Sequence, residues 1–551
     1  MPNAGLDCII VGYNDINFGD YAARQKKLEN TSGAYHELKT NSVLLHGRRH
    51  TYMELINQAM ERSQGKNPQL NVFEAPALGA FYLRNYLQRR GFSARVINFF
   101  TYDKDKFAEL LASHPATVAI TTTFYIEYAP VAEIINFVRE RSTETKIIVG
   151  GPYVFNLSAD LDTGTLEFMF QQIAADIYIM DSQGEETLAR VIDCLHNRGM
   201  SQLHAIPNLA FTLDGTTFTK TPRLPENNSL DESTIDWSQV DPSQISPICY
   251  LRTARSCPFA CTFCNYPTMA GEHVVTKLEN IESQLKYLHS IRTTDLVFID
   301  DTFNVPLPRF KNLLRMMLRE KLTFRWISFF RCSNADEEAI QLMQEAGCAG
   351  VLLGIESGDP QILKYMNKQA TLDGYKWGMD RLHKRGIATF ASLICGFPGE
   401  TEASVANTIR FVEESAPTFF NVQLYYHDTR SPVHAKAQEF KLQGAGYNWR
   451  HRSMDWREAM EWSKHMFRSV KNSGYLSLYG FSLWGVAYLL SRGFSMDQVK
   501  KFSYLVKPML FSSLDDVPGN FSDLESQLTE LFRPTVLIPH NPPPLSEVIA
   551  A

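Results

Sequence analysis

The sequence predicts an α/β protein with an N-terminal Rossmann-like parallel sheet, then a partial (β/α)6 barrel, then a mostly helical C-terminal tail. Two series of short apolar runs, each run followed by a segment of helical periodicity, predict the two α/β units, because parallel strands need a crossover between them. A polar, Pro-bearing span at 224–247 separates the two series and has the composition of a linker. Beyond residue 435 the alternation ends and apolar helical patterns replace it.

Length and composition limit the class of protein. A chain of 551 residues is too long for one ordinary domain, and 44% hydrophobic with 21% charged residues is typical of globular proteins. The net charge of −6 gives no basic footprint for nucleic acid, and no apolar run reaches the ~18–20 residues that span a bilayer. No signal-peptide pattern is visible, and nine cysteines, three of them clustered, favour a reducing compartment. We therefore expect a cytoplasmic protein with no nucleic-acid or membrane partner.

The first series defines an N-terminal domain, predicted at residues 1–223. A buried strand at 7–14 opens it, and a polar, irregular stretch with helical pieces near 20–30 and 51–63 follows. Further strands are predicted at 94–100, 117–124, 146–151 and 176–180, with amphipathic helices between them. These units predict an open parallel sheet covered on both faces.

The second series defines the barrel domain, predicted at residues 248–435. Its first strand leads into the clustered cysteines, and five more strands follow at 295–301, 324–332, 350–357, 387–396 and 419–425. The helices between them are predicted at 281–291, 310–318, 334–347, 375–385 and 401–414. Six such units predict a partial barrel with its functional side chains at the carboxyl ends of the strands.

The C-terminal domain, predicted at residues 436–551, is mainly helical. Trp456, Met460, Ser463 and Phe467 share one helix face, and residues 482–491 form a second, nearly all-apolar helix. Two roles for this tail remain open: it caps the barrel and binds substrate, or its helices only close the open barrel edge.

The clearest chemical signal is a loop with three cysteines, Cys257, Cys261 and Cys264, in the spacing Cys-x3-Cys-x2-Cys. Thiolates are soft ligands that suit zinc or iron–sulfur clusters. A structural zinc site takes four ligands and cluster irons are normally held by four thiolates, whereas the local count here is three. A 4Fe–4S cluster held by three cysteines leaves one iron open for another ligand. The alternatives are a zinc knuckle with a distant fourth ligand and three unrelated thiols.

This spacing, with the aromatic Phe263 just before the last cysteine, is similar to the signature of radical S-adenosylmethionine (SAM) enzymes. The resemblance implies a 4Fe–4S cluster whose open iron chelates SAM and generates a 5′-deoxyadenosyl radical. It also implies functions for strand-end residues of the barrel. Asp300 and Asp301 would hold the amino group of SAM, or else act as helix-start or surface carboxylates.

Three later strands carry the other residues that the resemblance assigns to SAM. Arg331 would pair with a carboxylate of SAM or of a substrate, or else form a buried ion pair with Glu356. Glu356 and Ser357 would contact the ribose or methionine part, and Ile394 would lie against the adenine.

The N-terminal domain resembles the cobalamin-binding domain that precedes many radical SAM barrels. The resemblance rests on Thr121–Thr123, on Gly150 with Gly151, and on Gly184–Glu186. It departs at residues 14–20, where the family often carries Asp-x-His-x-x-Gly and this chain has no histidine. Either cobalamin binds without a histidine ligand, or the domain keeps the fold without the cofactor.

Two barrel thiols suggest a reaction. Cys395, and as a second candidate Cys332, would donate a hydrogen atom to a substrate radical, as an epimerase requires. Against this, free cysteine is often a small buried hydrophobe, and strand alternation places Ile394 and Cys395 on opposite faces.

Across both domains, the chain resembles the group that contains peptide epimerases and phosphinate P-methyltransferases. The first hypothesis is a radical SAM epimerase that converts L- to D-residues in a ribosomally made precursor peptide. The second is a cobalamin-dependent radical SAM methyltransferase that acts on an unactivated carbon or a phosphinate phosphorus of a small molecule. A third is a non-catalytic metal-binding or scaffold protein. Either enzyme would need an electron donor such as flavodoxin or ferredoxin.

Overall fold

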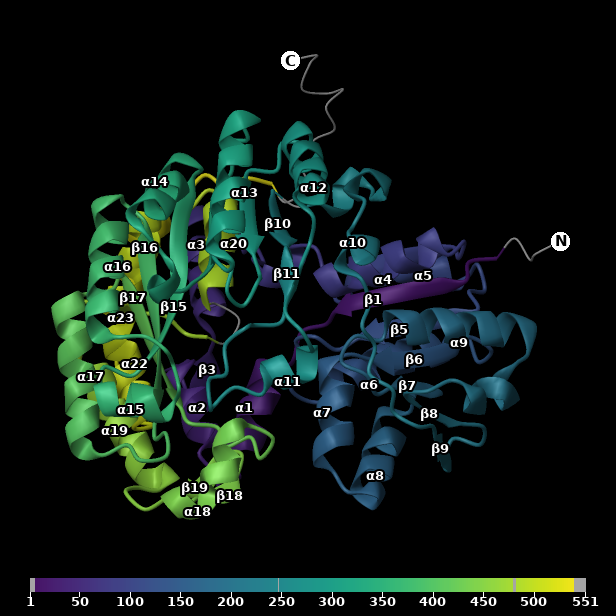
Figure 1. Cartoon of the computed structure of the whole chain (residues 1–551), viewed down its shortest axis with the longest axis horizontal. Helices are drawn as coiled ribbons and strands as arrows, with labels where there is room; N and C mark the ends of the chain where they lie inside the picture. The colour runs from purple at the N-terminus through teal and green to yellow at the C-terminus, as the bar shows by residue number, and fades with distance from the viewer. Residues whose placement is uncertain (1–4, 246, 479–481, 540–551) are drawn as a thin grey trace.

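The computed structural model describes residues 5–245, 247–478 and 482–539, so the end of the predicted C-terminal domain lies outside the described residues. The chain forms two seven-stranded sheets that lie side by side (Figure 1). The first sheet has this spatial order of strands: β4 (Ala94–Phe99), β1 (Cys8–Tyr13), β5 (Thr117–Thr121), β6 (Lys146–Gly150), β7 (Ile177–Ile179), β8 (Leu209–Thr212) and β9 (Phe218–Lys220). The first five are parallel, and the antiparallel pair β8 and β9, which the sequence analysis missed, extends one edge.

Helices cover both faces of the first sheet, as the alternation of buried residues in β1 requires. Ile10 faces a core shared with α4 (Leu78–Arg89) and α9 (Glu185–Asn197). Ile9 and Val11 face a separate core with the opposite helices. These are α5 (Lys104–Leu111), α6 (Ala129–Arg139), α7 (Pro152–Asp160) and α8 (Thr163–Ile173). The predicted Rossmann-like sheet is therefore confirmed.

The second sheet is parallel throughout and forms the predicted partial barrel. Its strands, in order, are β10 (Ile248–Leu251), β13 (Asp295–Phe298), β14 (Arg325–Phe330), β15 (Cys348–Glu356), β16 (Ala388–Cys395), β17 (Phe419–Leu424) and β20 (Gly474–Tyr475). The outer helices are α12 (Leu278–Ser290), α13 (Leu307–Arg319), α14 (Glu337–Glu345), α16 (Leu372–Lys384), α17 (Glu402–Ser415) and α19 (Trp456–Ser469). The seventh strand, β20, comes from the tail and pairs with β17, which the sequence analysis did not predict.

The apolar tail helix α20 (Ser482–Ser491) lies on the inner side of the barrel. In β14, Phe330 packs on Phe310 of the outer helix α13, with ring centroids 6.4 Å apart. The neighbouring Phe329 points the other way and meets Trp484 of α20 at 5.5 Å. Helix α20 also contacts β10 and β13, so the tail fills the inside of the barrel next to its first three strands (Figure 1).

The N-terminal stretch that seemed irregular in sequence packs on the tail instead of the first sheet. It contains α1 (Phe18–Lys26), α2 (Ala34–Thr40), the hairpin β2 (Val43–Leu45) with β3 (Arg48–His50), and α3 (Tyr52–Gln64). Its partners are the tail helices α22 (Lys507–Leu514) and α23 (Ser522–Phe532), while α21 (Met496–Leu505) packs on β20 and α23. We call α2, β2, β3 and α3 with α21–α23 the terminal lobe.

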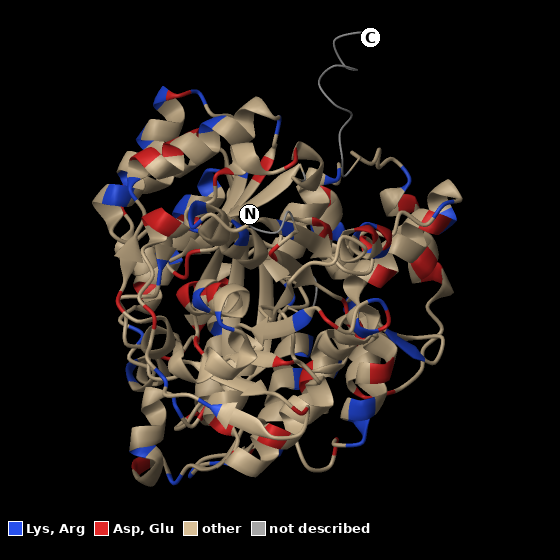
Figure 2. Ribbon diagram, turned by 90° about the vertical axis from the view of Figure 1, so that its right-hand side faces the viewer, with Lys and Arg blue, Asp and Glu red and all other residues tan. Residues whose placement is uncertain are grey.

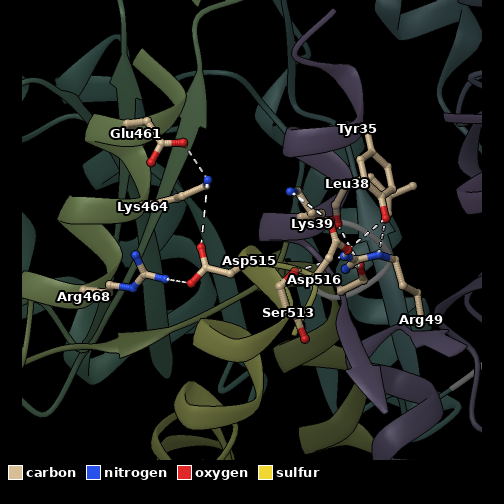
Figure 3. A network of polar contacts seen from close by, with 11 residues as sticks. Tyr35, Leu38, Lys39, Arg49, Glu461, Lys464, Arg468, Ser513, Asp515 and Asp516 are labelled. Atoms are coloured by element: carbon tan, nitrogen blue, oxygen red, sulfur yellow. Dashed lines mark hydrogen bonds and ion pairs between the residues drawn. The ribbon is translucent and has the colours of Figure 1, made fainter. Parts of the chain in front are cut away.

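A polar network joins the two ends of the chain inside the terminal lobe (Figure 3). The Asp516 carboxylate pairs with Arg49, lies 3.2 Å from Lys39 Nζ and accepts a hydrogen bond of 3.1 Å from the Tyr35 hydroxyl. Arg49 is 6% exposed and Asp516 is half-buried, and their pair joins β3 to the end of α22.

Two further observations concern the linker and the surface. In the span predicted as a linker, Trp237 is fully buried and its ring lies 5.6 Å from that of Phe81, so this segment packs on α4. Basic and acidic residues are interspersed over the view in Figure 2. Among the described residues, no helix is both long and apolar enough to cross a membrane.

Candidate active site

The cysteine loop begins at the carboxyl end of β10, and Asp300 fixes its first residues. The fully buried Asp300 carboxylate accepts hydrogen bonds from the backbone N–H groups of Thr253 (2.6 Å) and Ala254 (3.0 Å), and from the Thr253 hydroxyl. Arg309 donates to the Thr253 carbonyl from the other side, at 3.0 Å. All of these contacts of Asp300 are internal, so the structure gives it a positioning role and does not support direct contact with SAM.

The far side of the cysteine loop is bonded to the segment after α15 (Pro360–Tyr365). Thr262 N–H donates to the Met366 carbonyl at 2.9 Å, and the Asn367 side chain donates to the Ala260 carbonyl at 2.8 Å. The Thr262 carbonyl accepts from Val433 N–H, beyond the sixth strand, at 2.8 Å. The loop is therefore held by three different strand ends of the barrel.

The three thiols are free and belong to one electrostatic group. Cys261 is buried, and Cys257 and Cys264 are half-buried. Burial raises the pKa of Cys264 to about 11, and the neighbouring Cys261 and Cys257 add to that rise. Within the described residues, no three His, Cys, Asp or Glu side chains converge on a point that would hold a single metal ion. A cubane cluster is wider than one ion, and three thiolates on one loop suit it, so the donor set fits a 4Fe–4S cluster.

Asp301 faces the thiols, in contrast to its neighbour Asp300. Its side chain is exposed, hydrogen-bonds with Tyr266 of α11 (Tyr266–Ala270), and interacts electrostatically with Cys257 and Cys264. The surrounding protein raises the pKa of Asp301 to about 6 through desolvation. Only one of the two predicted carboxylates is thus placed to bind an ammonium group beside the cluster.

Two cations lie against the aromatic residues of the cysteine loop. The guanidinium carbon of Arg331 is 3.6 Å from the centroid of the Phe259 ring, and Lys368 Nζ is 5.5 Å from that of Phe263. Arg331 also donates to the Lys368 carbonyl and to the Ser333 hydroxyl. It does not pair with Glu356, so the alternative of a buried Arg331–Glu356 pair is wrong.

Glu356 pairs with Lys368, a residue that the sequence analysis missed. The Lys368 Nζ to Glu356 Oε1 distance is 2.8 Å, and each side chain is 10% exposed. Glu356 adopts φ +63°, an uncommon conformation that is often found at functional sites. A Cβ on Gly354 would lie 2.4 Å from Glu356 Oε1, so the pair needs glycine at that position. No spacing rule joins residues 356 and 368, and their contact forms only when the chain returns after α15.

We expect Lys368→Met to destabilise the protein by about 3–5 kcal/mol, because it leaves Glu356 buried without its counter-charge. Denaturant unfolding of the cluster-loaded protein measures the loss. Lys368→Arg is the control that keeps the charge. The double variant Lys368→Met/Glu356→Gln should recover part of the stability, and a Lys368→Met protein as stable as the wild type would disprove the coupling.

Ser357 and Ile394, also predicted to contact SAM, differ in their placement. The Ser357 hydroxyl is fully buried, lies 3.2 Å from that of Thr408 in α17, and accepts from Asp359 N–H. It therefore fixes the strand end and does not line the site. Ile394 is half-buried on the inner face of β16, as a residue beside a bound adenine must be.

Neither candidate hydrogen-atom donor reaches the inside of the barrel. Cys395 lies on the outer face of β16, and its thiol contacts the Ala459 carbonyl of α19 at 3.4 Å. Cys332 packs on α16, where a Cβ on Gly378 would lie 2.5 Å from its sulfur. The predicted alternation of Ile394 and Cys395 is thus present in β16. Both thiols lie against covering helices, and the geometry does not support their role as donors.

Glu400, just after β16, gives the fold a pH dependence. Its carboxylate is 1% exposed and accepts from Gly396 N–H at 2.5 Å, and burial raises its pKa to about 8. Because the folded pKa lies above the unfolded one, the stabilising contribution of the protonated form is complete at low pH and is lost as the pH rises toward 8.

We therefore expect Glu400→Gln to flatten the fall in melting temperature between pH 6 and 9 and to exceed the wild type by several degrees at pH 9. Thermal unfolding across this range provides the measurement. The exposed Glu402→Gln is the control, and equal slopes for Glu400→Gln and wild type would contradict the assignment.

The carboxyl edge of the first sheet meets the cysteine loop. The Ser182 hydroxyl, after β7, donates to the Met269 carbonyl of α11 at 2.9 Å. Arg430, after β17, reaches across to Asp160 of α7 at 3.3 Å. At this edge the loop after β5 exposes three large apolar side chains, Phe124, Ile126 and Tyr128. Exposed apolar groups that gather in one loop mark a binding surface.

The glycine and threonine residues of the cobalamin-like pattern lie at the same edge. Gly151 has φ +107°, and a Cβ there would lie 2.9 Å from Thr122 Oγ1. The loop after β1 offers no strong metal ligand: Asn14 is bonded to Pro130 and Glu133, and Asp15 accepts from Asn71. Glycine at 151 lets the backbone come close to Thr122 at this edge, and residues 14–20 contain no histidine that could ligate cobalt.

Comparisons with known proteins agree with this arrangement. Residues 251–412 match the family model of the radical SAM superfamily, so the chain carries a radical SAM domain, and this domain implies a 4Fe–4S cluster and SAM as cofactors. Over 392 residues the chain is 28% identical to the uncharacterized methyltransferase PH0819 of Pyrococcus horikoshii; the match covers 68% of this chain and 81% of that protein.

Two solved structures share the fold across both sheets. The methyltransferase TsrM of Kitasatospora setae, with cobalamin and a [4Fe-4S] cluster bound, has a TM-score of 0.56 at 16% identity and covers 83% of this chain and 96% of its own. The cobalamin-dependent SAM radical enzyme OxsB, with aqua-cobalamin bound, has a TM-score of 0.58 at 12% identity and covers 96% of this chain and 84% of its own. These structures confirm the fold class predicted from the sequence, and the family model confirms the radical SAM resemblance over residues 251–412.

Proposed function

We propose that this protein is a cobalamin-dependent radical SAM methyltransferase that acts on an unactivated carbon or a phosphinate phosphorus of a small molecule. The observation that carries the proposal is the exposed apolar loop after β5, at Phe124, Ile126 and Tyr128, on the sheet whose carboxyl edge contacts α11 just after the cysteine loop. The similarity to PH0819 over most of the chain supports methyl transfer as the reaction. The peptide epimerase that the sequence analysis favoured has no comparable support, since both candidate donor thiols face covering helices.

Different residues of the barrel bind different parts of the cofactors. When bound, the cluster and SAM supply a reactive organic radical, and cobalamin supplies a methyl group for transfer. Cys257, Cys261 and Cys264 hold the cluster, and Asp301 accepts from the SAM amino group. Ile394 excludes water beside the adenine. Arg331 and Lys368 keep the cysteine loop against the strand ends, and an external reductant such as flavodoxin or ferredoxin provides electrons.

The test is purification after expression with a cobalamin supply, followed by product analysis. We expect about one corrinoid per chain, and both S-adenosylhomocysteine and 5′-deoxyadenosine when SAM and a reductant are added. Phe124→Asp/Ile126→Asp should lose the corrinoid while it retains iron, because charges on that edge oppose a flat apolar ligand. The exposed Phe168→Asp, on α8 away from this edge, is the matched control.

The opposite outcome of this test would favour the epimerase hypothesis. Protein without corrinoid that forms 5′-deoxyadenosine alone, and that places one deuterium from D2O at a peptide Cα, would contradict the methyltransferase.

A further inference from the structure

Arg252 occupies the junction between the two sheets, one residue beyond β10 and five before Cys257. Its guanidinium carbon lies 4.3 Å from the ring centroid of Tyr82 in α4, a helix of the first domain. It also interacts electrostatically with Glu185, at the start of α9, and with Tyr266 of α11. These neighbours come from the first domain and from the helix after the cysteine loop, so Arg252 lies where the two meet. Figure 1 shows β11 (Ala254–Arg255) and α11 between the barrel and the first sheet.

The Arg252 guanidinium is incompletely paired. Its Nε is buried and has no hydrogen-bond partner within the described part of the chain. The Nε of the nearby Arg255 is unpartnered as well, but the terminal nitrogens of Arg255 bond to Gln183 (2.8 Å) and to the Asn228 carbonyl (2.7 Å). The side chain of Arg252 has a hydrogen bond with Tyr82 and none to a carboxylate or carbonyl in the described part of the chain. A buried donor without a partner is costly, and a ligand carboxylate would complete the bonds of Arg252.

The surroundings select a carboxylate among anions. A guanidinium presents a planar fork that matches a carboxylate in two parallel hydrogen bonds, and the Tyr82 ring holds that plane. Glu185 and Asp301 place negative charge around Arg252. This charge opposes a multiply charged phosphate but tolerates a single carboxylate, and Asp301 can accept from an amino group on the same molecule.

We propose that Arg252 binds a carboxylate of the methyl acceptor where the first domain meets the cysteine loop. The identification of this ligand as the methyl acceptor rests on the proposed function. The preference of the site for a carboxylate is independent of that function. The methionine part of SAM carries the same group, and the experiment must separate the two sources.

The probe is trifluoroacetate, observed by fluorine NMR line broadening on cluster-loaded protein, with trifluoroethanol as the neutral comparison. We expect saturable broadening that persists when SAM is present in saturating amount. Arg252→Gln should weaken binding roughly tenfold or more, as expected for loss of a charge-assisted pair. Arg90→Gln is the matched control, because Arg90 stacks on Tyr86 of the same helix at 3.5 Å but lies at the surface.

Each result decides the proposal. Loss of broadening on adding SAM would assign the carboxylate to SAM and overturn the acceptor site. Equal binding by Arg252→Gln and wild type would overturn the role of Arg252. If the protein lacks corrinoid while the Arg252-dependent binding persists with SAM, the carboxylate site stands and only the methyltransferase assignment fails.

Discussion

Replacing Cys261 with alanine should lower the iron content from about four per chain to background and abolish 5′-deoxyadenosine formation. Cys261 is the buried member of the three thiols, and both of its loop neighbours Ala260 and Thr262 are bonded to the segment after α15. Its position is therefore fixed, and no other thiol can take its place without breaking these bonds. Iron analysis, the charge-transfer absorption of the cluster and chromatography of SAM products measure the effect.

The control for this variant is Cys194→Ala. Cys194 is also buried but lies in α9 of the first domain, where its thiol donates to the Gly199 carbonyl. It should keep full iron content and SAM cleavage. Retention of the cluster in Cys261→Ala, or its loss in Cys194→Ala, would refute the assignment of the cluster ligands.

The second large effect is a difference between variants of the adjacent residues Asp300 and Asp301. Asp300→Ala removes the acceptor for two buried N–H groups and a hydroxyl, which costs about 1–3 kcal/mol for each unsatisfied group. We expect a less stable protein with little iron, because the cysteine loop loses its first anchor. Asp301→Asn should keep stability and iron but weaken SAM binding about tenfold to a hundredfold, since an ammonium loses its charged partner.

Denaturant unfolding, iron content and equilibrium dialysis with SAM distinguish these outcomes. If both variants lose iron equally, Asp301 is also a positioning residue. If both bind SAM normally, neither carboxylate contacts it.

The regular part of the fold could be predicted because local periodicity encodes it. The strands β1, β4–β7, β13, β14, β16 and β17 lie within predicted runs, β15 begins two residues before its predicted start at 350, and the predicted helices between the strands are present. What the pattern could not reveal is long-range docking. The terminal lobe joins residues that are far apart in sequence, such as Arg49 and Asp516, which are separated by 467 positions, and no local sequence pattern predicts such a contact.

The site shows the same limit at the scale of single side chains. The motif identified the three cysteines, and strand alternation predicted that Cys395 and Ile394 lie on opposite faces of their strand. Asp300 bonds to the start of the cysteine loop and Asp301 faces the thiols because of how the chain bends after β13. Two adjacent aspartates in a sequence do not indicate which of them takes which position. Lys368 was invisible because it follows a short helix outside the predicted elements, and its importance comes from Glu356 and Phe263.

The terminal lobe has a consequence for how the protein is made. During translation the first sheet can fold as soon as its own strands emerge, whereas α2, β2, β3 and α3 must wait for partners that are made after the six predicted barrel strands. The inner helix α20 and the edge strand β20 belong to the same later segment. Until this segment emerges the barrel lacks its inner filling, so we expect maturation with iron and sulfide to follow the synthesis of the tail helices. A nascent chain halted near residue 435 should hold a folded first sheet and a cysteine loop not yet able to retain its cluster.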